Sequence, residues 1–126
     1  MQFHKIGRAG EDLATNYLKK IGYEVISSNY FNQKGYRIGE IDIIAEDRKE
    51  NQLVFVEVKA RKGSSEFVCP GGNMTNQKIK KIIKAVNYFL RKENLVEKNW
   101  RVDLVEVFFD FQTRKAQINH IKAIHF

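Results

Sequence analysis

The chain has 126 residues, a length that predicts one folded domain covering residues 1–126. Hydrophobic residues make up 43% and charged residues 29%, which is typical of a globular protein and excludes a disordered or collagen-like chain. The longest apolar runs are too short to cross a bilayer, so we expect no membrane span. Because no secretory signal is visible after Met1 and the single Cys69 cannot form an internal disulfide, we expect a cytoplasmic protein.

The charge balance favours a polyanionic partner. Lys and Arg together number 22 against 15 Asp and Glu, which gives a formal net charge of +7. Nucleic acid is the first partner that such an excess indicates, and an anionic membrane surface is the second. The chain lacks the basic amphipathic helix with exposed aromatic residues that membrane-surface binding needs, so no membrane partner is expected. On charge alone, binding to nucleic acid and the absence of any such partner remain comparable alternatives.

The first half of the chain predicts one helix followed by strands. Apolar residues recur at helical spacing over 6–21, and Gly22 suits the end of that helix. Short apolar segments then predict three strands, at 23–30, 40–45 and 53–60. The third of these strands is expected to be central in its sheet, because both of its faces are largely apolar. Polar or turn-forming residues separate these segments, at 32–39, 47–52 and 63–76.

The second half predicts a helix and at least one further strand. The helical period returns from Thr75 to Leu90, with Thr75 or Asn76 as its N-cap. Residues 102–109 form a strongly apolar strand, and the chain then ends in either a strand at 116–118 or a helical turn. The order of helix, strands, helix and strand predicts an α/β or α+β protein with a mixed sheet flanked by helices.

Charged residues interrupt two neighbouring strands that are otherwise apolar. Side chains alternate along a strand, so Asp42 is expected to share a face with Glu40, and Glu57 with Lys59. A hairpin centred between residues 49 and 50 would place Asp42 opposite Glu57 and Glu40 opposite Lys59. Directly opposed carboxylates destabilise a sheet, and a divalent cation between them would remove that cost.

This arrangement predicts a site for Mg²⁺ or Mn²⁺, because both ions prefer carboxylate oxygens and water as ligands. Asp42 and Glu57 would supply two carboxylates, and the backbone carbonyl of Val58 a third oxygen. Lys59 would orient the metal-bound water or stabilise negative charge developing on a phosphate. Such a set suits hydrolysis of a phosphodiester bond. The alternative is a buried structural ion cluster, although two acids and one base leave a net charge that burial penalises.

Four further residues are candidates for the same site. Glu11 lies on the inward stripe of the first helix and would supply a third acid, or it would simply complement the helix dipole. Arg61 would contact phosphate or form a solvated strand end. Lys78 and Lys81 would bind nucleic acid or belong to an ordinary solvated helix face. Lys78 is the stronger candidate, because amide donors at a helix N-terminus also favour phosphate.

The charged strands also carry a family resemblance. The sequences GEIDIIA at 39–45 and FVEVKAR at 55–61 resemble the D…(D/E)-x-K core of the restriction-endonuclease-like nucleases. Further matching motifs are GEDLA at 10–14, Asn29-Tyr30, Lys78, Arg101-Val102-Asp103 and Asn119-His120-Ile121. Together they resemble the YraN-type bacterial proteins, which are predicted nucleases similar to archaeal Holliday-junction resolvases. The resemblance covers nearly the whole chain, although the loop at 68–73 fits it less well.

The resemblance implies a three-layer α/β core of the restriction-endonuclease type with a Mg²⁺-dependent nuclease site. Asp42 and Glu57 match the metal-binding acids, Lys59 the catalytic lysine, and Glu11 a helix glutamate that often completes such sites. The implied activity is an endonuclease acting on DNA, including branched or structured DNA. The alternative is a non-catalytic nucleic-acid-binding module that keeps the nuclease fold. Symmetrical cleavage of two strands would favour a homodimer.

Overall fold

The computed structural model describes residues 3–31, 40–63, 72 and 74–124. In chain order, its elements are α1 (Phe3–Lys20), β1 (Glu24–Phe31), β2 (Glu40–Asp47), β3 (Gln52–Lys62), α2 (Asn76–Lys92), β4 (Trp100–Asp110) and β5 (Lys115–Ile121). The predicted turn at 32–39, Cys69 and most of the predicted loop at 63–76 lie outside the described residues. Each predicted helix and strand is present, and of the two alternatives for the chain end the strand is correct.

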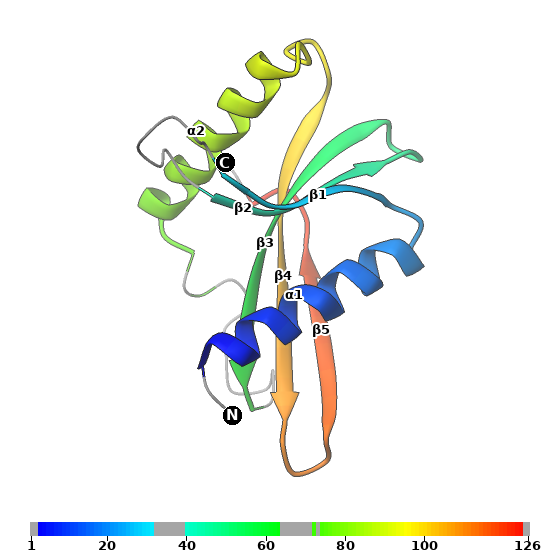
Figure 1. Ribbon diagram of the computed structural model, residues 1–126, viewed down its shortest axis with the longest axis vertical. Coiled ribbons are helices and arrows are strands. Elements are labelled where there is room, and N and C mark those ends of the chain that lie inside the picture. Colours follow the sequence, from blue (N-terminus) through cyan, green and yellow to red (C-terminus); the bar gives the residue numbers. More distant parts are fainter. Residues whose placement is uncertain (1–2, 32–39, 64–71, 73, 125–126) are drawn as a thin grey trace.

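The strands form one mixed sheet between two helices (Figure 1). Its order is β1-β2-β3-β4-β5, in which β3 and β4 pair in parallel and the other neighbours pair antiparallel. A parallel pair requires a crossover connection, and α2 lies in the connection between β3 and β4. The α/β prediction of a central mixed sheet flanked by helices is therefore confirmed, and the architecture is consistent with a restriction-endonuclease-like core.

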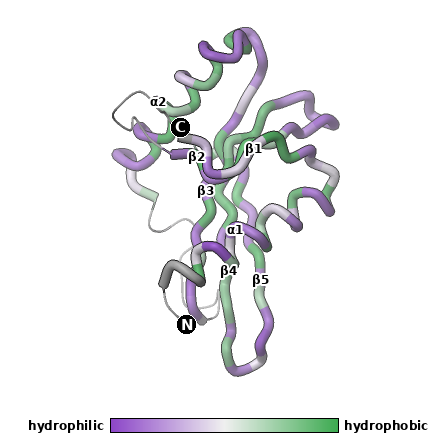
Figure 2. Tube along the Cα trace, in the orientation of Figure 1, coloured by the Kyte–Doolittle hydropathy of each residue, from purple (hydrophilic) through white to green (hydrophobic). Residues whose placement is uncertain are grey.

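Each helix covers its own face of the sheet. On one face α2 packs its apolar stripe against β2, β3 and β4, through residues that include Ile82, Val86, Phe89, Ile44, Phe55 and Val102. On the other face α1 packs against the same strands, through residues that include Ala14, Leu18, Ile43, Val54, Val56 and Val105. All of 53–56 is buried, as predicted for a strand covered on both faces. The hydropathy colouring shows hydrophobic residues along most of β4 as well (Figure 2).

Local contacts fix the start of α2 and the packing of α1 against the sheet. Thr75 is the N-cap of α2, and its side chain accepts a hydrogen bond from the backbone N–H of Lys78 at 3.2 Å. In α1, a Cβ atom added to Gly10 would lie 2.8 Å from the Cβ of Ala60 in β3. Only a glycine therefore allows α1 to approach β3 this closely, and Glu11 is the next residue of the helix.

A buried polar network joins the strands on the α1 side. Arg101 of β4 donates from Nε to Asp103 at 3.0 Å, from Nη1 to Asp47 at 3.2 Å and from Nη2 to the Tyr23 hydroxyl at 2.6 Å. His120 Nε2 of β5 lies 2.8 Å from the second oxygen of Asp103. Burial alone would raise the pKa of Asp103, but hydrogen bonds from His120, the Ala123 amide and Arg101 hold this pKa below its ordinary value.

This network explains why the end of β2 and the starts of β3 and β4 extend further than predicted. The sequence pattern treats 47–52 as a polar connection and begins the last strong strand at residue 102. In the structure Asp47 and Gln52 belong to strands, and both accept hydrogen bonds from Arg101. These two residues are polar because they bind the Arg101 guanidinium group, not because they face solvent.

No helix within the described ranges is both long and apolar enough to cross a membrane.

The first prediction concerns the acid at the centre of this network. Asp103→Asn leaves the buried Arg101 without its main counter-charge, so we expect the free energy of unfolding to fall by about 3 kcal/mol near pH 7. Because the pKa of Asp103 is lowered by folding, its contribution is present above the ordinary Asp value and is lost as the pH falls below it. Urea unfolding between about pH 6 and pH 3 measures both effects.

The matched control is Asp12→Asn, which neutralises an exposed acid on α1. This control is expected to change the free energy of unfolding by less than about 0.5 kcal/mol. If Asp103→Asn lost stability on acidification as steeply as the wild-type protein does, Asp103 would not be the acid-sensitive group.

Candidate functional site

The register of the β2–β3 hairpin brings Asp42 and Glu57 together. The two strands pair from Asp47 opposite Gln52 to Ile43 opposite Val56. This is the register of a hairpin centred between residues 49 and 50, so the predicted register is confirmed over the paired residues. Asp42 and Glu57 are the next two residues beyond the last pair. The carboxylates therefore lie at the point where the β2–β3 ladder ends.

Asp42 lies where β2 continues its regular pairing with β1 but is past its last pair with β3. The charge of Glu40 acts on its pKa, in keeping with the predicted shared face. The Asp42 carboxylate accepts a hydrogen bond from the backbone N–H of Val58 at 2.8 Å. A side chain thus takes the place of a backbone partner, which fixes the carboxylate in position between the strands.

Glu57 and Lys59 form the second part of the site. Lys59 Nζ lies 3.5 Å from Glu57 Oε1, and the two side chains are 31% and 18% exposed respectively. Burial and the charge of Asp42 raise the pKa of Glu57 to about 7, against the opposing influence of Lys59 and Lys78. Burial also raises the pKa of Asp42, although the Val58 amide and Lys59 act against this. The two acids are therefore a like-charged, partly buried pair.

Glu11 approaches this pair from α1. Its pKa is raised by burial and by the charge of Asp42, so the two carboxylates are close enough to interact electrostatically. Within 3–31, 40–63, 72 and 74–124, however, no three His, Cys, Asp or Glu side chains are near enough to one another to hold a metal ion on their own. The structure thus brings Glu11 toward Asp42 without making it part of a compact ligand cluster.

The donor set fits a hard divalent cation. Asp42 and Glu57 supply two carboxylates whose mutual repulsion a cation would relieve, and the carbonyl of Val58 belongs to the same segment of β3. Mg²⁺ is commonly held by one or two carboxylates and completes its shell with water and substrate phosphate. Two acids are therefore enough for such an ion, and their raised pKa values are the expected state of a metal-free pair.

The predicted basic residues differ in how close they come to the acids. Lys78, in the first turn of α2, lies near enough to Glu57 for its charge to lower the pKa of that residue. Arg61 follows Lys59 at the next position of β3 that points to the same face, and its Nε lies 3.4 Å from Glu106. Lys81 is exposed on α2, and within the described part of the chain no contact joins it to either acid. The site therefore includes Lys78 and Arg61 more directly than Lys81.

Sequence reasoning missed Glu106, which is fully buried in β4. Its Oε2 forms an ion pair with Arg61 Nε at 3.4 Å, and its Oε1 accepts a hydrogen bond from the side-chain Nδ2 of Asn119 at 3.1 Å. The signal was available, since Glu106 is a charged residue in the middle of the apolar segment 102–109. Arg101, Asp103 and His120, which belong to the family motifs, lie instead in the buried network on the α1 side.

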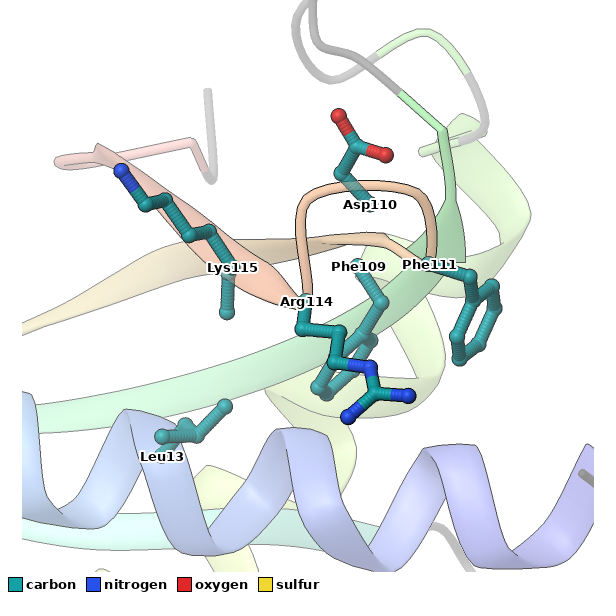
Figure 3. Close-up of a pocket in the computed structure, with 7 residues that line it drawn as sticks. Leu13, Phe109, Asp110, Phe111, Arg114 and Lys115 are labelled. Atoms are coloured by element: carbon teal, nitrogen blue, oxygen red, sulfur yellow. The ribbon is translucent and has the colours of Figure 1, made fainter.

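A pocket between α1 and the β4–β5 hairpin lies apart from these acids. Figure 3 shows it with Leu13 on the helix and Phe109 and Phe111 on the hairpin. Among the described residues that line it, Asp110 is the only acid. This pocket therefore lacks the paired carboxylates on which metal chemistry would depend.

Fold and site together define an α/β protein whose central sheet carries two close carboxylates and a lysine. The profile of Uncharacterised protein family UPF0102 matches residues 10–107, and the chain belongs to that family. This is the YraN-type family that the sequence motifs indicate, so the predicted family is confirmed. The matched range includes Asp42, Glu57, Lys59, Arg61 and Glu106.

Relatives from three bacteria align with almost the whole chain. A UPF0102 protein of Caldicellulosiruptor bescii is 40% identical over 97% of this chain and 98% of its own length. One from Clostridium kluyveri is 37% identical over 93% of this chain and 90% of its own. One from Clostridioides difficile is 38% identical over 91% of each chain. The chain is thus similar to these proteins over its full fold, not over an isolated motif.

The second prediction follows from the like-charged pair. Because folding raises the pKa of Glu57 to about 7, the metal-free protein loses stability as the pH rises from the ordinary Glu value of 4.5 to about 7. Asp42→Asn removes one charge of the pair and keeps an oxygen for the Val58 amide. We therefore expect this variant to be more stable than the wild-type protein at pH 8 by about 1–2 kcal/mol, with little difference at pH 4.5.

Urea unfolding at both pH values in the presence of EDTA measures this effect. Glu97→Gln is a suitable control, since it neutralises an exposed acid in the segment that follows α2. Equal stability losses in the wild-type protein and Asp42→Asn over this pH range would contradict the prediction.

Proposed function

We propose that this protein is a divalent-metal-dependent endonuclease that hydrolyses phosphodiester bonds in DNA, with branched or structured DNA among its substrates. The observation that carries the proposal is the meeting of Asp42, Glu57 and Lys59 at the open end of the β2–β3 ladder. Two partly buried acids are there held close together at a cost in stability. A protein that needed these residues only for its fold would gain by replacing the like-charged pair with apolar residues.

Asp42 and Glu57 would hold a Mg²⁺ or Mn²⁺ ion, with the carbonyl of Val58 as a third oxygen. When bound, the ion supplies Lewis-acid chemistry and lowers the pKa of water at the site. The Val58 amide fixes the Asp42 carboxylate, so this ligand would need little reorganisation on binding. Binding would also favour the ionised form of Glu57, whose pKa of about 7 leaves it partly protonated in the metal-free protein.

Lys59 would act on the phosphate. Its ammonium group is held 3.5 Å from Glu57 while it stays partly exposed. Once Glu57 is engaged with a cation, this ammonium group can donate hydrogen bonds to a phosphate oxygen or to the attacking water. Fixed donors aimed at developing negative charge are among the largest contributions to catalysis.

Basic residues around the acids would bind the DNA backbone. Lys78 lies in the first turn of α2, close enough to influence Glu57, and Arg61 continues the basic row of β3 beyond Lys59. The net charge of +7 would strengthen association with any nucleic acid. Lys81 would contribute through its charge on the exposed side of α2. A homodimer would place two such sites on one substrate, which suits symmetrical cleavage.

A nucleic-acid-binding module without catalytic activity is the second candidate function. The observation in its favour is that no third acid joins Asp42 and Glu57 in a compact cluster among the described residues. The two candidates differ in their need for metal, because a binding module would retain DNA in EDTA and would leave it intact.

The third prediction is the loss of cleavage in variants of the site. With Mg²⁺ or Mn²⁺, we expect the wild-type protein to cut DNA, and Asp42→Asn and Lys59→Ala to reduce the rate at least about 10²-fold. Single-stranded, duplex and four-way-junction DNAs are the substrates to assay. Lys62→Ala is the matched control, since Lys62 follows Arg61 in β3 and points to the other face of the sheet. Cleavage that survives in both site variants would exclude this site.

The fourth prediction concerns metal binding without any substrate. Calorimetric titration with Mn²⁺ is expected to show saturable binding to the wild-type protein at pH 8 and none to Asp42→Asn or Glu57→Gln. Because Glu57 must lose its proton, binding is expected to weaken at pH 6. Equal binding by the wild-type protein and both variants would show that the ion is held elsewhere.

A further inference from the structure

A second charged group lies beside the carboxylate site on the same face of the sheet. It consists of Arg61 in β3, Glu106 in β4 and Asn119 in β5, one residue from each of three adjacent strands. Arg61 Nε lies 3.4 Å from Glu106 Oε2, and Asn119 Nδ2 donates to Glu106 Oε1 at 3.1 Å. Within the described part of the chain, Glu106 is the charged partner of Arg61.

The strand register ties this group to the site. Lys59 pairs with Glu106 across the parallel β3–β4 ladder, and Glu106 pairs with Asn119 across β4–β5. Arg61 lies two residues beyond Lys59, so its side chain reaches diagonally back across β4 to Glu106, which is level with Lys59. Two positions along a strand span about 6–7 Å, which is close to the separation of consecutive phosphates in a nucleic-acid strand.

The burial of Glu106 is costly for stability alone. Its side chain is fully buried, whereas that of Arg61 is 17% exposed. Removing a carboxylate from water costs several kcal/mol, and an apolar residue at such a position is often as stable or more stable. Glu106 lies between Val105 and Val107, so an apolar residue would suit its strand. The pairing therefore calls for a reason other than stability.

Orientation of the guanidinium group supplies that reason. An arginine presents five N–H donors in a rigid plane, and the contact with Glu106 is made through Nε. Among the described residues Arg61 Nε makes no hydrogen bond, so its contact with Glu106 Oε2 is an ion pair that draws the guanidinium plane toward β4. The two terminal nitrogens retain the fork geometry that matches a phosphate.

We infer that Glu106 is a positioning residue that orients Arg61 to bind the backbone phosphate next to the one held at Asp42, Glu57 and Lys59. This inference rests on the proposed function, because it assumes that a nucleic-acid strand runs across this face. Asn119 supports the arrangement by donating to the other oxygen of Glu106.

A simple electrostatic role for Glu106 makes the opposite prediction. Glu106→Gln removes one negative charge from a protein whose net charge is already +7. If charge alone governed the affinity for DNA, this variant would bind more tightly than the wild-type protein. If Glu106 orients Arg61, the variant binds more weakly despite its greater positive charge.

Fluorescence anisotropy with a labelled duplex and a four-way junction, in EDTA and at several salt concentrations, separates these outcomes. We expect Arg61→Ala to weaken binding about tenfold and to reduce the slope of log K against log salt by about 0.9. Arg61→Lys keeps the charge but lacks the fork, so it is expected to recover only part of the affinity. Glu106→Gln is expected to weaken binding about threefold or more. Lys62→Ala, on the opposite face, is the charge-matched control.

Three results would overturn the inference. They are tighter or unchanged binding by Glu106→Gln, a loss in Arg61→Ala no greater than in Lys62→Ala, and full affinity in Arg61→Lys. If Glu106→Gln fails to fold, as judged by its thermal unfolding, Asn119→Ala takes its place, because it removes the hydrogen bond to Glu106 without changing a charge, and affinity equal to that of the wild-type protein would then overturn the inference. The assay requires no cleavage. If the protein cleaves DNA but any of these three results is found, only the role of Glu106 is refuted. If the expected binding losses occur in a protein that does not cleave DNA, only the proposed nuclease activity is refuted.

Discussion

The register of β3 is the constraint on which the rest of the structure depends. This strand is buried on both faces over 53–56, pairs antiparallel with β2 and pairs in parallel with β4. Its first half supplies apolar side chains to both cores, and its second half carries the charged residues. Because side chains alternate with a period of two, a shift of one residue would move every charged group into the opposite core. The packing of one half therefore fixes the position of the site in the other half.

Two groups of buried charge in the sheet differ in their balance of positive and negative charge. On the α1 side, Arg101 and Asp103 neutralise each other and are surrounded by hydrogen-bond partners, so the network is complete without any ligand. At the end of the β2–β3 ladder, Asp42 and Glu57 repel each other, and their pKa values are raised. A closed network of this kind stabilises the fold, whereas a pair left with excess negative charge is suited to binding a cation.

Much of the fold was predictable because each element carries a local signal. The helical stripes, the caps and the apolar runs identified the elements, and the polar segment between two strands fixed the hairpin register that brings Asp42 to Glu57. The predicted end of β2 and start of β3 were wrong, because Asp47 and Gln52 have a buried partner, Arg101, that lies far away in sequence. The burial of Glu106 and the hydrogen bond from the Val58 amide to Asp42 depend on packing between strands, which no local pattern records.

The single parallel pair in the described sheet also has a consequence for the order of folding. The β2–β3 and β4–β5 pairs join neighbouring segments through short turns, whereas β3 and β4 are separated by the connection that contains α2. Contacts between distant segments must overcome a larger loop-closure entropy, so local hairpins tend to form first. The two acids Asp42 and Glu57 then belong to one early hairpin, while the contact of Arg61 with Glu106 joins two hairpins. The same sheet face would thus be assembled in two stages, with the carboxylate pair in place before its arginine.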